Sequence, residues 1–383
     1  MKSKNEKKNI LIEGWRGINH SYAMVNQYQL LELANRGDVN VFHRDLPFFK
    51  SEWNTVNNSN GLDSDKNKII NSLKNITNEK VDITYRITFP FRLYGGHSDK
   101  IFAFGTAEFQ TLDGYLYQGP ENSENHVNKK VFIITPSYWS REGFLRNGFK
   151  AEEVVVVPHG VDTNIFKPLD NTQRILNRNA LKLNDQHFMF LNVGAMTWNK
   201  GIDILLLAFA QINKKYPDTR LVLKDQSNLY GIGALDILAD MKKNHPSLFT
   251  DSIFSRIGVL SNNFTLNQLK ALYNTSDAYI SPYRAEGFNM PPLEAAACGV
   301  PVALTSGGAS DDYFNDSFAL KIDGFKKTDG NRHFIEPDTD SLIGIMSDLI
   351  EHRTPHINRF QALHYINEKF SWKTVINRLL EIF

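Results

Sequence analysis

The sequence predicts an α/β protein built from two doubly wound, Rossmann-like domains of parallel sheet. Its 383 residues exceed what one hydrophobic core usually organises, so two domains of ordinary size are expected. Short apolar runs alternate with helical patterns along the chain, which is typical of parallel strands covered by helices on both faces. The same alternation starts again near Phe188, after a polar stretch.

The first half contains short apolar runs that predict buried strands at 9–13, 39–43, 81–87, 100–104, 131–134 and 154–157. A helix is expected after the first strand and through about Arg36, because Met24, Tyr28 and Leu31 recur at helical spacing. Residues 49–80 are rich in Asn, Ser and Lys, so a loop with one helix near 69–76 is expected there. A further helix is expected at 140–147.

A domain boundary is expected in the run 158–168, which holds one Gly and two Pro and is followed by the polar segment 170–179. Beyond it, strands are predicted at 188–193, 221–223, 255–259, 277–282 and 300–305. Helices are predicted at 200–212, 266–275, 341–351, 358–369 and 372–383, the first with Ile202, Leu205, Phe209 and Ile212 on one face.

The stretch 281–299 places Glu286 and Glu294 eight positions apart across a turn. A strand leads in, and a helix starting at Pro291 and Pro292 leads out, since proline suits the first helical turn. A helix N-terminus attracts anions, and carboxylates accept hydrogen bonds from hydroxyls, so this turn suits a ligand with both phosphate and polyol. Taken singly, Glu294 is also explained as an ordinary first-turn charge and Glu286 as a solvated loop residue.

This order of strand, glycine-containing loop, proline and Leu-Glu-Ala-x-Ala-x-Gly resembles the E-x7-E signature of retaining GT-B glycosyltransferases of family 4. The resemblance covers nearly the whole chain and implies two facing domains with a cleft between them. It implies an acceptor-side domain at 1–168, a donor-binding domain at 169–369, and a final helix, 370–383, that packs back on the first domain.

The resemblance also implies roles for the residues of the acidic turn. Glu294 is expected to accept both ribose hydroxyls of a nucleotide sugar, and Glu286 to contact hydroxyls of the transferred hexose in catalysis. The nucleobase is expected near Arg256 and Ile257. The backbone amides expected to hold sugar and phosphate are those of Gly287, Phe288, Asn289 and Met290.

Loss of a nucleoside diphosphate requires stabilisation of negative charge, which lysines and helix dipoles provide without a metal. Lys200 follows the Gly194 loop, and its surroundings resemble the K-G-x-D element of the family, so a catalytic role is expected; a surface lysine is the alternative. The family commonly has an arginine where this chain has Ala195. Lys224, at the end of the next strand, is expected to supply a second cation, with a solvated strand end as the alternative.

The loop 14–20 lies between a strand and a helix, an arrangement that presents backbone amides to a phosphate. The resemblance implies that it reaches the donor and acceptor, with Arg16 and Gly17 as donor contacts and His20 as a catalytic residue. For His20, a helix-start or packing role is an equal alternative. The segment 104–108 lacks the histidine that many family members carry there. The variable segment 49–80 is the candidate for acceptor specificity.

Composition excludes several other classes of protein. The chain has 43 Lys and Arg against 42 Asp and Glu, so nothing indicates a nucleic-acid partner. Its one cysteine, Cys298, excludes intrachain disulfides and cysteine-based metal clusters. Asp63, Ser64 and Asp65 formally make a DxD motif but lie in the polar loop, so neither a metal nor a cofactor is expected.

A cytoplasmic location is expected. The start, MKSKNEKKN, is basic but lacks the apolar run of a signal peptide, and no stretch approaches about 18 uninterrupted apolar residues. At most, the early lysines touch an anionic membrane surface; a solvated tail is the main alternative.

Residues and resemblance together predict a retaining hexosyltransferase that uses a nucleotide-diphosphate sugar without a metal. Its acceptor is expected to be a glycan, a lipid-linked molecule or another hydroxyl compound. One alternative is a nucleotide-sugar epimerase or phosphorylase on the same fold. Another is a non-catalytic nucleotide- or glycan-binding module, against which the presence of Glu286, Glu294 and Lys200 argues.

Overall fold

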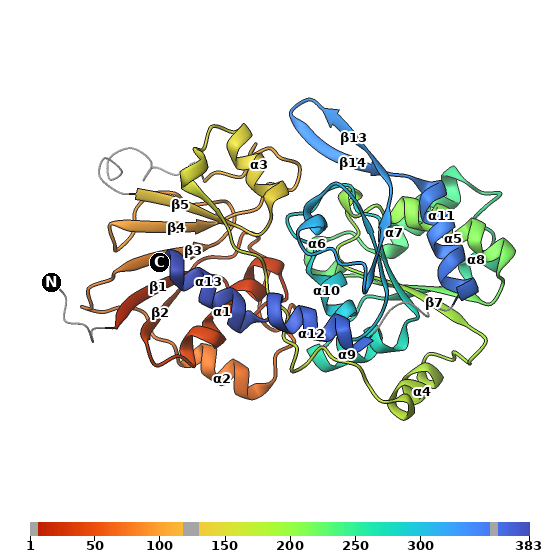
Figure 1. Cartoon of the computed structure of the whole chain (residues 1–383), viewed down its shortest axis with the longest axis horizontal. Coiled ribbons are helices and arrows are strands. Elements are labelled where there is room, and N and C mark those ends of the chain that lie inside the picture. Colours follow the sequence, from red (N-terminus) through yellow and green to blue (C-terminus); the bar gives the residue numbers. More distant parts are fainter. Residues whose placement is uncertain (1–6, 118–129, 353–358) are drawn as a thin grey trace. The chain divides into compact units, whose positions relative to one another are not determined.

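The computed structural model describes residues 7–117, 130–352 and 359–383. Backbone contacts divide the chain into two units, residues 1–160 with 372–383 and residues 161–371. The division falls within the run 158–168 (Figure 1). Lys2 and Lys4 of the basic start, and Asn358, the expected first residue of a helix, lie outside the described residues. The cleft between two domains stays a prediction.

The first unit contains a six-stranded parallel sheet in the order β2-β1-β3-β4-β5-β6. Every strand predicted from an apolar run in this half is present. Its strands are β1 (Lys8–Gly14), β2 (Val39–Asp45), β3 (Ile83–Ile87), β4 (Lys100–Phe104), β5 (Lys130–Thr135) and β6 (Val154–Val156). Its helices are α1 (Ser21–Ala34), α2 (Ser64–Ser72), α3 (Tyr138–Arg146), the short turn η2 (Ala151–Glu153) and α13 (Trp372–Ile382).

Helix α2 begins five residues before the expected helix near 69–76. The Asp63 side chain caps it by accepting a hydrogen bond from the Lys66 amide at 2.8 Å. Capping by a short acidic side chain fixes the start of a helix, and only Ile70 of this helix is buried. The formal DxD sequence at 63–65 is therefore the beginning of a helix.

The last helix, α13, packs on α1 within the first unit. The Trp372 ring stacks on the Tyr28 ring with centroids 5.2 Å apart and planes 8° from parallel. Arg36, just beyond α1, donates a hydrogen bond to Asn377 at 2.6 Å. The amphipathic pattern expected at 372–383 is confirmed by burial of Trp372, Val375, Ile376 and Leu379.

The second unit contains a six-stranded parallel sheet in the order β12-β11-β10-β7-β8-β9. Numbered within the unit, this is the 3-2-1-4-5-6 order of dinucleotide-binding folds, in which the winding reverses between the first and fourth strands. That reversal lies between β7 and β10. The strands are β7 (Phe188–Val193), β8 (Thr219–Lys224), β9 (Ile257–Leu260), β10 (Ala278–Ser281), β11 (Val302–Thr305) and β12 (Ala319–Ile322).

Helices and a hairpin surround this second sheet. The helices and short turns are α4 (Asn171–Ala180), η3 (Trp198–Lys200), α5 (Ile202–Lys215), α6 (Ser227–Tyr230), α7 (Ala234–Asn244), α8 (Asp251–Phe254), α9 (Leu266–Thr275), α10 (Met290–Ala297), η4 (Ala309–Asp312), α11 (Thr339–His352) and α12 (Arg359–Phe370). The hairpin consists of β13 (Gly324–Asp329) and β14 (Arg332–Pro337). Within the described residues, no helix combines the length and apolar character needed to cross a bilayer.

Helix α4 lies in the polar segment 170–179, where the sequence predicted no helix. Asp170 caps it by accepting from the Gln173 amide at 2.8 Å. Its inward contacts are polar: Arg174 and Arg178 both form ion pairs with Asp277, at 2.7 and 3.0 Å. An apolar periodicity therefore does not mark this helix, because guanidinium groups rather than aliphatic side chains attach it to the sheet.

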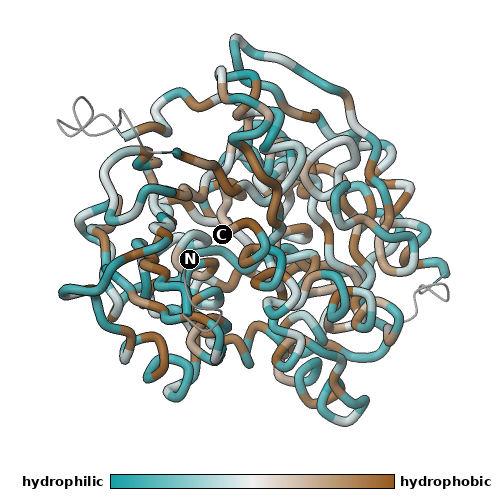
Figure 2. The backbone as a smooth tube through the Cα atoms, turned by 60° about the vertical axis from the view of Figure 1, so that its left-hand side comes forward, coloured by the Kyte–Doolittle hydropathy of each residue, from teal (hydrophilic) through white to brown (hydrophobic). Residues whose placement is uncertain are grey.

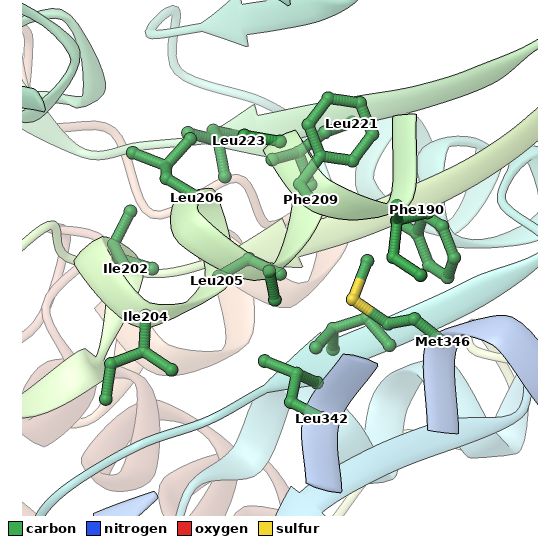
Figure 3. Packing of buried hydrophobic residues seen from close by; sticks show 14 of the residues in the cluster. Phe190, Ile202, Ile204, Leu205, Leu206, Phe209, Leu221, Leu223, Leu342 and Met346 are labelled. Carbon is green, nitrogen blue, oxygen red and sulfur yellow. The ribbon is translucent and has the colours of Figure 1, made fainter. Parts of the chain in front are cut away.

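The core of the second unit is centred on α5, which lies between the sheet and α11. Figure 3 shows Leu205 of α5 directed toward α11, whose Leu342 and Met346 belong to the same buried cluster. Leu206 and Phe209 of α5 belong to the same cluster as Leu221 and Leu223 of β8. Figure 2 shows hydrophobic residues along interior segments and hydrophilic ones along outer loops. This core fixes α5, and with it the loop that precedes the helix.

Gly201, between η3 and α5, is the first position that we predict to be intolerant of substitution. A Cβ atom there would lie 1.8 Å from the carbonyl oxygen of Pro282, and the residue has a φ of +66°. We expect Gly201→Ala to lower the free energy of unfolding by at least about 3 kcal/mol, because a backbone clash adds to left-handed strain. Urea unfolding measures this loss.

The matched control is Gly231→Ala. Gly231 has a φ of +80° but no atom within 4 Å of the added Cβ. Only left-handed strain of about 1–2 kcal/mol is expected there. Equal losses at the two glycines would show that the contact with Pro282 imposes no constraint.

Candidate active site

Two loops meet at the point where the winding of the second sheet reverses. One follows β7 and spans 194–201, and the other follows β10 and spans 282–289. Ligands of open α/β sheets bind at the carboxyl ends of the strands beside such a reversal. The site expected from the sequence at Lys200 and Glu286 lies on these two loops.

Asn199 joins the two loops through its backbone and its side chain. Its carbonyl oxygen accepts hydrogen bonds from the amides of Arg284 and Ala285, at 2.7 and 3.2 Å. Its side-chain amide donates to the carbonyl of Ala285 at 3.0 Å. Thr197 donates to the remaining side-chain oxygen at 2.7 Å. The residue before Lys200 is thereby fixed against the residues before Glu286.

Lys200 and Glu286 form an ion pair, with Lys200 Nζ 2.6 Å from Glu286 Oε1. The lysine side chain keeps 22% of its surface exposed and the glutamate 8%. Lys200 ends the turn η3 and is separated from α5 by the left-handed Gly201, so it lies before the helix rather than in its first turn as expected. The structure thus brings together two residues that the sequence assigned separately to phosphate and hexose.

Arg284 is a residue that the sequence reasoning missed. Its guanidinium group donates to both carboxylate oxygens of Asp203, at 2.8 and 2.7 Å. It also donates to both carboxylate oxygens of Glu336, and the shortest bond to each of them is 2.9 Å. It also donates to the carbonyl of Trp198 at 2.9 Å. Burial lowers the pKa of this group, but its bonds to Asp203 and Glu336 raise it overall. The sequence shows only an arginine two positions before Glu286, and nothing local marks its partners at positions 203 and 336.

Glu294 lies in the first turns of α10 and is partly exposed. The hydroxyl of Tyr273, a fully buried residue of α9, donates to Glu294 Oε2 at 2.8 Å. Burial of the carboxyl raises its pKa to about 7, although the Tyr273 bond opposes the shift. Near neutral pH this carboxyl therefore exists in both protonated and ionised forms.

Side chains hold the turn 287–290 from its inner side. Asn289 has a φ of +72°, and its side-chain amide donates to Ser281 Oγ at 2.9 Å. Tyr313 donates to the carbonyl of Asn289 at 2.9 Å, and its ring lies 5.2 Å from that of the buried Phe288. Helix α10 then begins at Met290. Because the first amides of a helix have no partner within it, this turn presents an anion-binding end.

Lys224 ends β8, the strand next to β7, and is buried. Its ammonium group donates to the carbonyl of Asp225 and lies 5.1 Å from the centre of the Phe264 ring. Burial lowers the pKa of this lysine. Lys224 therefore lies at the expected edge of the sheet, in contact with groups of its own unit.

Arg256 and Ile257 lie at the opposite end of the sheet from the site loops. Ile257 pairs with Leu221 near the start of β8, whereas Leu260 pairs with Lys224 at the carboxyl end. The Arg256 carbonyl likewise accepts from the Leu221 amide at 3.0 Å. The expectation that a nucleobase contacts Arg256 and Ile257 is corrected by this placement, because ligands bind at the carboxyl edge, where β9 ends at Leu260.

In the first unit, Arg16 and Gly17 contact groups of the same unit. Arg16 binds both carboxylate oxygens of Asp45 at 2.8 Å and also donates to the carbonyl of Ile70. The Gly17 amide donates to Gln27 Oε1 at 2.7 Å, and a Cβ atom on Gly17 would lie 2.5 Å from Thr55. These contacts hold the loop after β1 in place; the expected donor contacts stay a prediction.

His20 caps helix α1. Its Nδ1 accepts a hydrogen bond from the Tyr22 amide at 3.2 Å, and its ring lies 4.9 Å from that of Trp53 and 5.3 Å from that of Trp15. Burial lowers the pKa of this imidazole to about 3, so it is neutral at pH 7. The helix-start and packing role, one of the two alternatives for His20, is therefore present in the structure.

Within the described ranges 7–117, 130–352 and 359–383, one group of potential metal ligands comes together, Asp348, Glu351 and His352. All three are exposed on α11. Exposed acidic groups of this kind are common without a metal, and these residues are not part of the two site loops.

Comparison with known proteins bears on the second unit directly. Residues 187–350 match the family described as Glycosyl transferases group 1. Mannosylfructose-phosphate synthase of Agrobacterium fabrum is 24% identical over 237 residues, which cover 61% of this chain and 48% of that protein. The chain spans about half, or less, of the length of the curated relatives that it matches first.

Solved structures extend the likeness to both units. A glycosyltransferase from Rickettsia africae matches with a TM-score of 0.69 and 15% identity, covering 98% of each chain. Alr3699/HepE of Anabaena, solved with UDP and glucose, matches with a TM-score of 0.66 and 15% identity over 98% of this chain and 99% of that one. Family match and fold agree: residues 187–350 match the group 1 glycosyltransferases, and the whole chain shares the GT-B fold of solved glycosyltransferases.

Proposed function

We propose that this protein transfers a hexose from a nucleotide-diphosphate sugar to a hydroxyl of a glycan or other acceptor, with retention of configuration and without a metal. The observation that carries the proposal is the Lys200–Glu286 ion pair at the β7/β10 reversal, with Glu294 in the helix that follows Glu286. All three residues lie within the matched family segment, 187–350. A cation, two carboxylates and a helix N-terminus together suit a ligand that combines diphosphate, ribose and hexose.

The ion pair explains how both charges stay compensated before and after binding. Without a donor, Lys200 neutralises the nearly buried Glu286. When a nucleotide sugar binds, its diphosphate becomes the partner of Lys200, and hexose hydroxyls donate to Glu286. An unpaired buried charge is strongly destabilising, so an exchange of partners is the favourable route.

The remaining donor contacts follow from the same turn. The backbone amides of the turn from Gly287 to Met290, which leads into α10, hold hexose and phosphate, and the ionised Glu294 accepts from the ribose hydroxyls. Lys224 is the candidate second cation in place of the arginine absent at Ala195; to reach phosphate it must exchange its bond to the Asp225 carbonyl. The solved UDP and glucose complex of HepE makes UDP-glucose the first donor to test.

The reaction breaks the bond between the anomeric carbon and the diphosphate oxygen. The acceptor oxygen bonds to that carbon from the same face, and its proton passes to an oxygen of the departing phosphate. Charge that develops on the diphosphate is stabilised by Lys200 and the N-terminus of α10. The pKa of His20, lowered to about 3, makes it a weak base, so the phosphate is the proposed proton acceptor.

Thermal unfolding with a panel of nucleotides tests the donor site. We expect one of UDP, GDP and ADP, and its sugar conjugate, to raise the unfolding temperature in buffer containing EDTA, because a ligand that binds only the folded state stabilises it. Nucleotide release with candidate hydroxyl acceptors then reports transfer. Absence of any shift across the panel would contradict the donor site, and transfer abolished by EDTA would contradict the metal-free route.

Lys200→Gln tests the phosphate contact. We expect the rate of transfer to fall about 100-fold or more, because a charged donor to the leaving group is lost while an amide donor to Glu286 remains. Lys200→Ala is less informative, since it leaves a carboxylate without its cation and lowers stability by about 3 kcal/mol or more. Nucleotide release and thermal unfolding measure the two effects.

Lys242→Gln is the matched control, because Lys242 forms an exposed ion pair with Asp251 at 3.3 Å outside the site. The double variant Lys200→Gln with Glu286→Gln removes both charges of the site pair. It is expected to fold stably and still fail to transfer. Transfer at the normal rate by Lys200→Gln would remove Lys200 from the mechanism.

Affinity for the nucleotide sugar is expected to rise with pH between 6 and 8. With a pKa of about 7, the Glu294 carboxyl is mostly protonated at pH 6 and mostly ionised at pH 8. Only the ionised form accepts from both ribose hydroxyls, so the dissociation constant should be about tenfold lower at pH 8. Titration calorimetry with a nucleotide sugar measures it, since its diphosphate diester does not titrate in this range.

Glu294→Gln is the control for this pH dependence. It is expected to bind more weakly than the wild type and with the same affinity at pH 6 and pH 8. A wild-type dissociation constant that does not change over this range would separate Glu294 from ribose recognition.

A further inference from the structure

Trp198 is a large exposed side chain beside the candidate active site. It lies two positions before Lys200, and 48% of its surface is accessible. The Arg284 guanidinium lies 4.5 Å from its ring centre, and that of Arg332 lies 5.9 Å away. The Phe334 ring meets it edge-on at 5.0 Å. The indole is therefore held in one position while nearly half of it remains available to a ligand.

The hairpin β13–β14, which extends from the sheet of its own unit in Figure 1, supplies these neighbours. Residues directly opposite each other in an antiparallel pair share one face. Glu336 bonds Arg284 and Phe334 contacts Trp198, so the face that carries them is turned toward the site loop. The opposed pairs on this face are Phe325 with Glu336, Lys327 with Phe334, and Asp329 with Arg332.

This face is amphipathic and carries more positive than negative charge where it is exposed. Phe325 is 58% accessible, and Lys327 and Arg332 are exposed. The carboxylate of Glu336 is bound to Arg284, which leaves Asp329 as the exposed acidic residue of the face. Aromatic rings flanked by cationic donors suit a ligand with an apolar ring face and an acidic substituent.

The strand that precedes the hairpin lies on the side of the sheet where the hexose is proposed to bind. The hairpin follows β12, an edge strand on the β10 side of the winding reversal. Strands β8 and β9 lie on the other side of the reversal, with Lys224 at the end of β8. Glu286, the proposed hexose contact, follows β10. In the order of strands, a ligand that contacts Trp198 and the hairpin is therefore on the side of the proposed hexose contact rather than on the side of Lys224.

We propose that Trp198, Phe325, Lys327, Arg332 and Phe334, here called the hairpin surface, form a subsite for an acidic saccharide acceptor. This inference rests on the proposed glycosyltransferase function and names the class of its acceptor. A sugar ring stacks on the exposed part of Trp198, and a carboxylate or phosphate on the saccharide binds Arg332 and Lys327. Binding there places an acceptor hydroxyl beside the loop that carries Lys200.

A glycan array tests the subsite with the full chain and saturating UDP. The array contains neutral oligosaccharides and matched ones that carry uronic acid or phosphate. We expect the wild type to retain acidic oligosaccharides in preference to neutral ones. Trp198→Ala, and separately the double variant Lys327→Ala with Arg332→Ala, should bind at least about tenfold more weakly, which corresponds to about 1.4 kcal/mol.

Phe360→Ala is the matched control, because Phe360 is a 76% exposed aromatic residue of the same unit, on α12. It should bind like the wild type. The double variant Lys327→Ala with Arg332→Ala changes only exposed side chains. It therefore still tests the subsite if Trp198→Ala disturbs the ion pairs of Arg284. The shift in unfolding temperature with UDP is measured for every variant as the check on fold and donor site.

The outcomes separate this inference from the proposed function. No shift with UDP, GDP or ADP in the wild type counts against the donor site itself. If UDP stabilises the wild type normally, the donor site stands and the array result decides the hairpin surface. That inference is overturned if the wild type binds no acidic saccharide, prefers neutral ones, or if the substituted variants bind acidic saccharides as well as the wild type does. Retention of the wild type on phosphatidylglycerol vesicles, lost in the same variants and without saccharide binding, would assign the surface to a membrane and also overturn it.

Discussion

The candidate site depends on the ion pairs of the buried Arg284, which hold four segments of the second unit together. Its guanidinium group binds Asp203 at the start of α5, Glu336 of β14, and the carbonyl of Trp198 in the loop after β7. A buried charge persists only where its hydrogen-bonding capacity is met, so these segments are fixed together or not at all. Lys200 and Glu286 lie two positions from Trp198 and Arg284, which explains their close approach at 2.6 Å. The hairpin surface and the donor site therefore share one support.

Local patterns predicted those parts of the fold that buried apolar residues determine. Strands β4 and β7 were predicted to the residue, because each is an apolar run bounded by polar residues. The two glutamates and Lys200 were selected from a strand, loop and helix-start pattern and from its resemblance to the E-x7-E and K-G-x-D elements of a known family. Arg284 was missed because its partners Asp203 and Glu336 are 81 and 52 positions away, and no local pattern reports such a distance. Helix α4 and the hairpin were missed because their residues are mainly polar and their contacts are ion pairs and ring contacts.

The error over Arg256 and Ile257 has a different physical origin. The strand that contains Ile257 was identified, but a short strand presents two ends and only its carboxyl end borders a ligand site. Strand β9 is four residues long, so its two ends lie about 10 Å apart at the usual rise per residue. A predicted strand therefore locates a ligand contact only when the carboxyl end of that strand is identified as well. The same rule, applied to β7 and β10, placed Lys200 and Glu286 at the carboxyl edge.

The two units use their winding reversals differently. In the first unit the reversal lies between β1 and β3, and the polar residues of the loop after β1 are engaged in holding that loop: Arg16 with Asp45, Gly17 with Gln27, and His20 with the start of α1. In the second unit the loops at the reversal present Lys200 and Glu286, and the helix that follows them, α10, presents Glu294 with a pKa near neutrality. Charge that can respond to a ligand is therefore concentrated in the second unit. We therefore propose that donor activation takes place in the second unit, whereas the partly buried, neutral His20 and its aromatic neighbours favour a contribution of shape from the first unit.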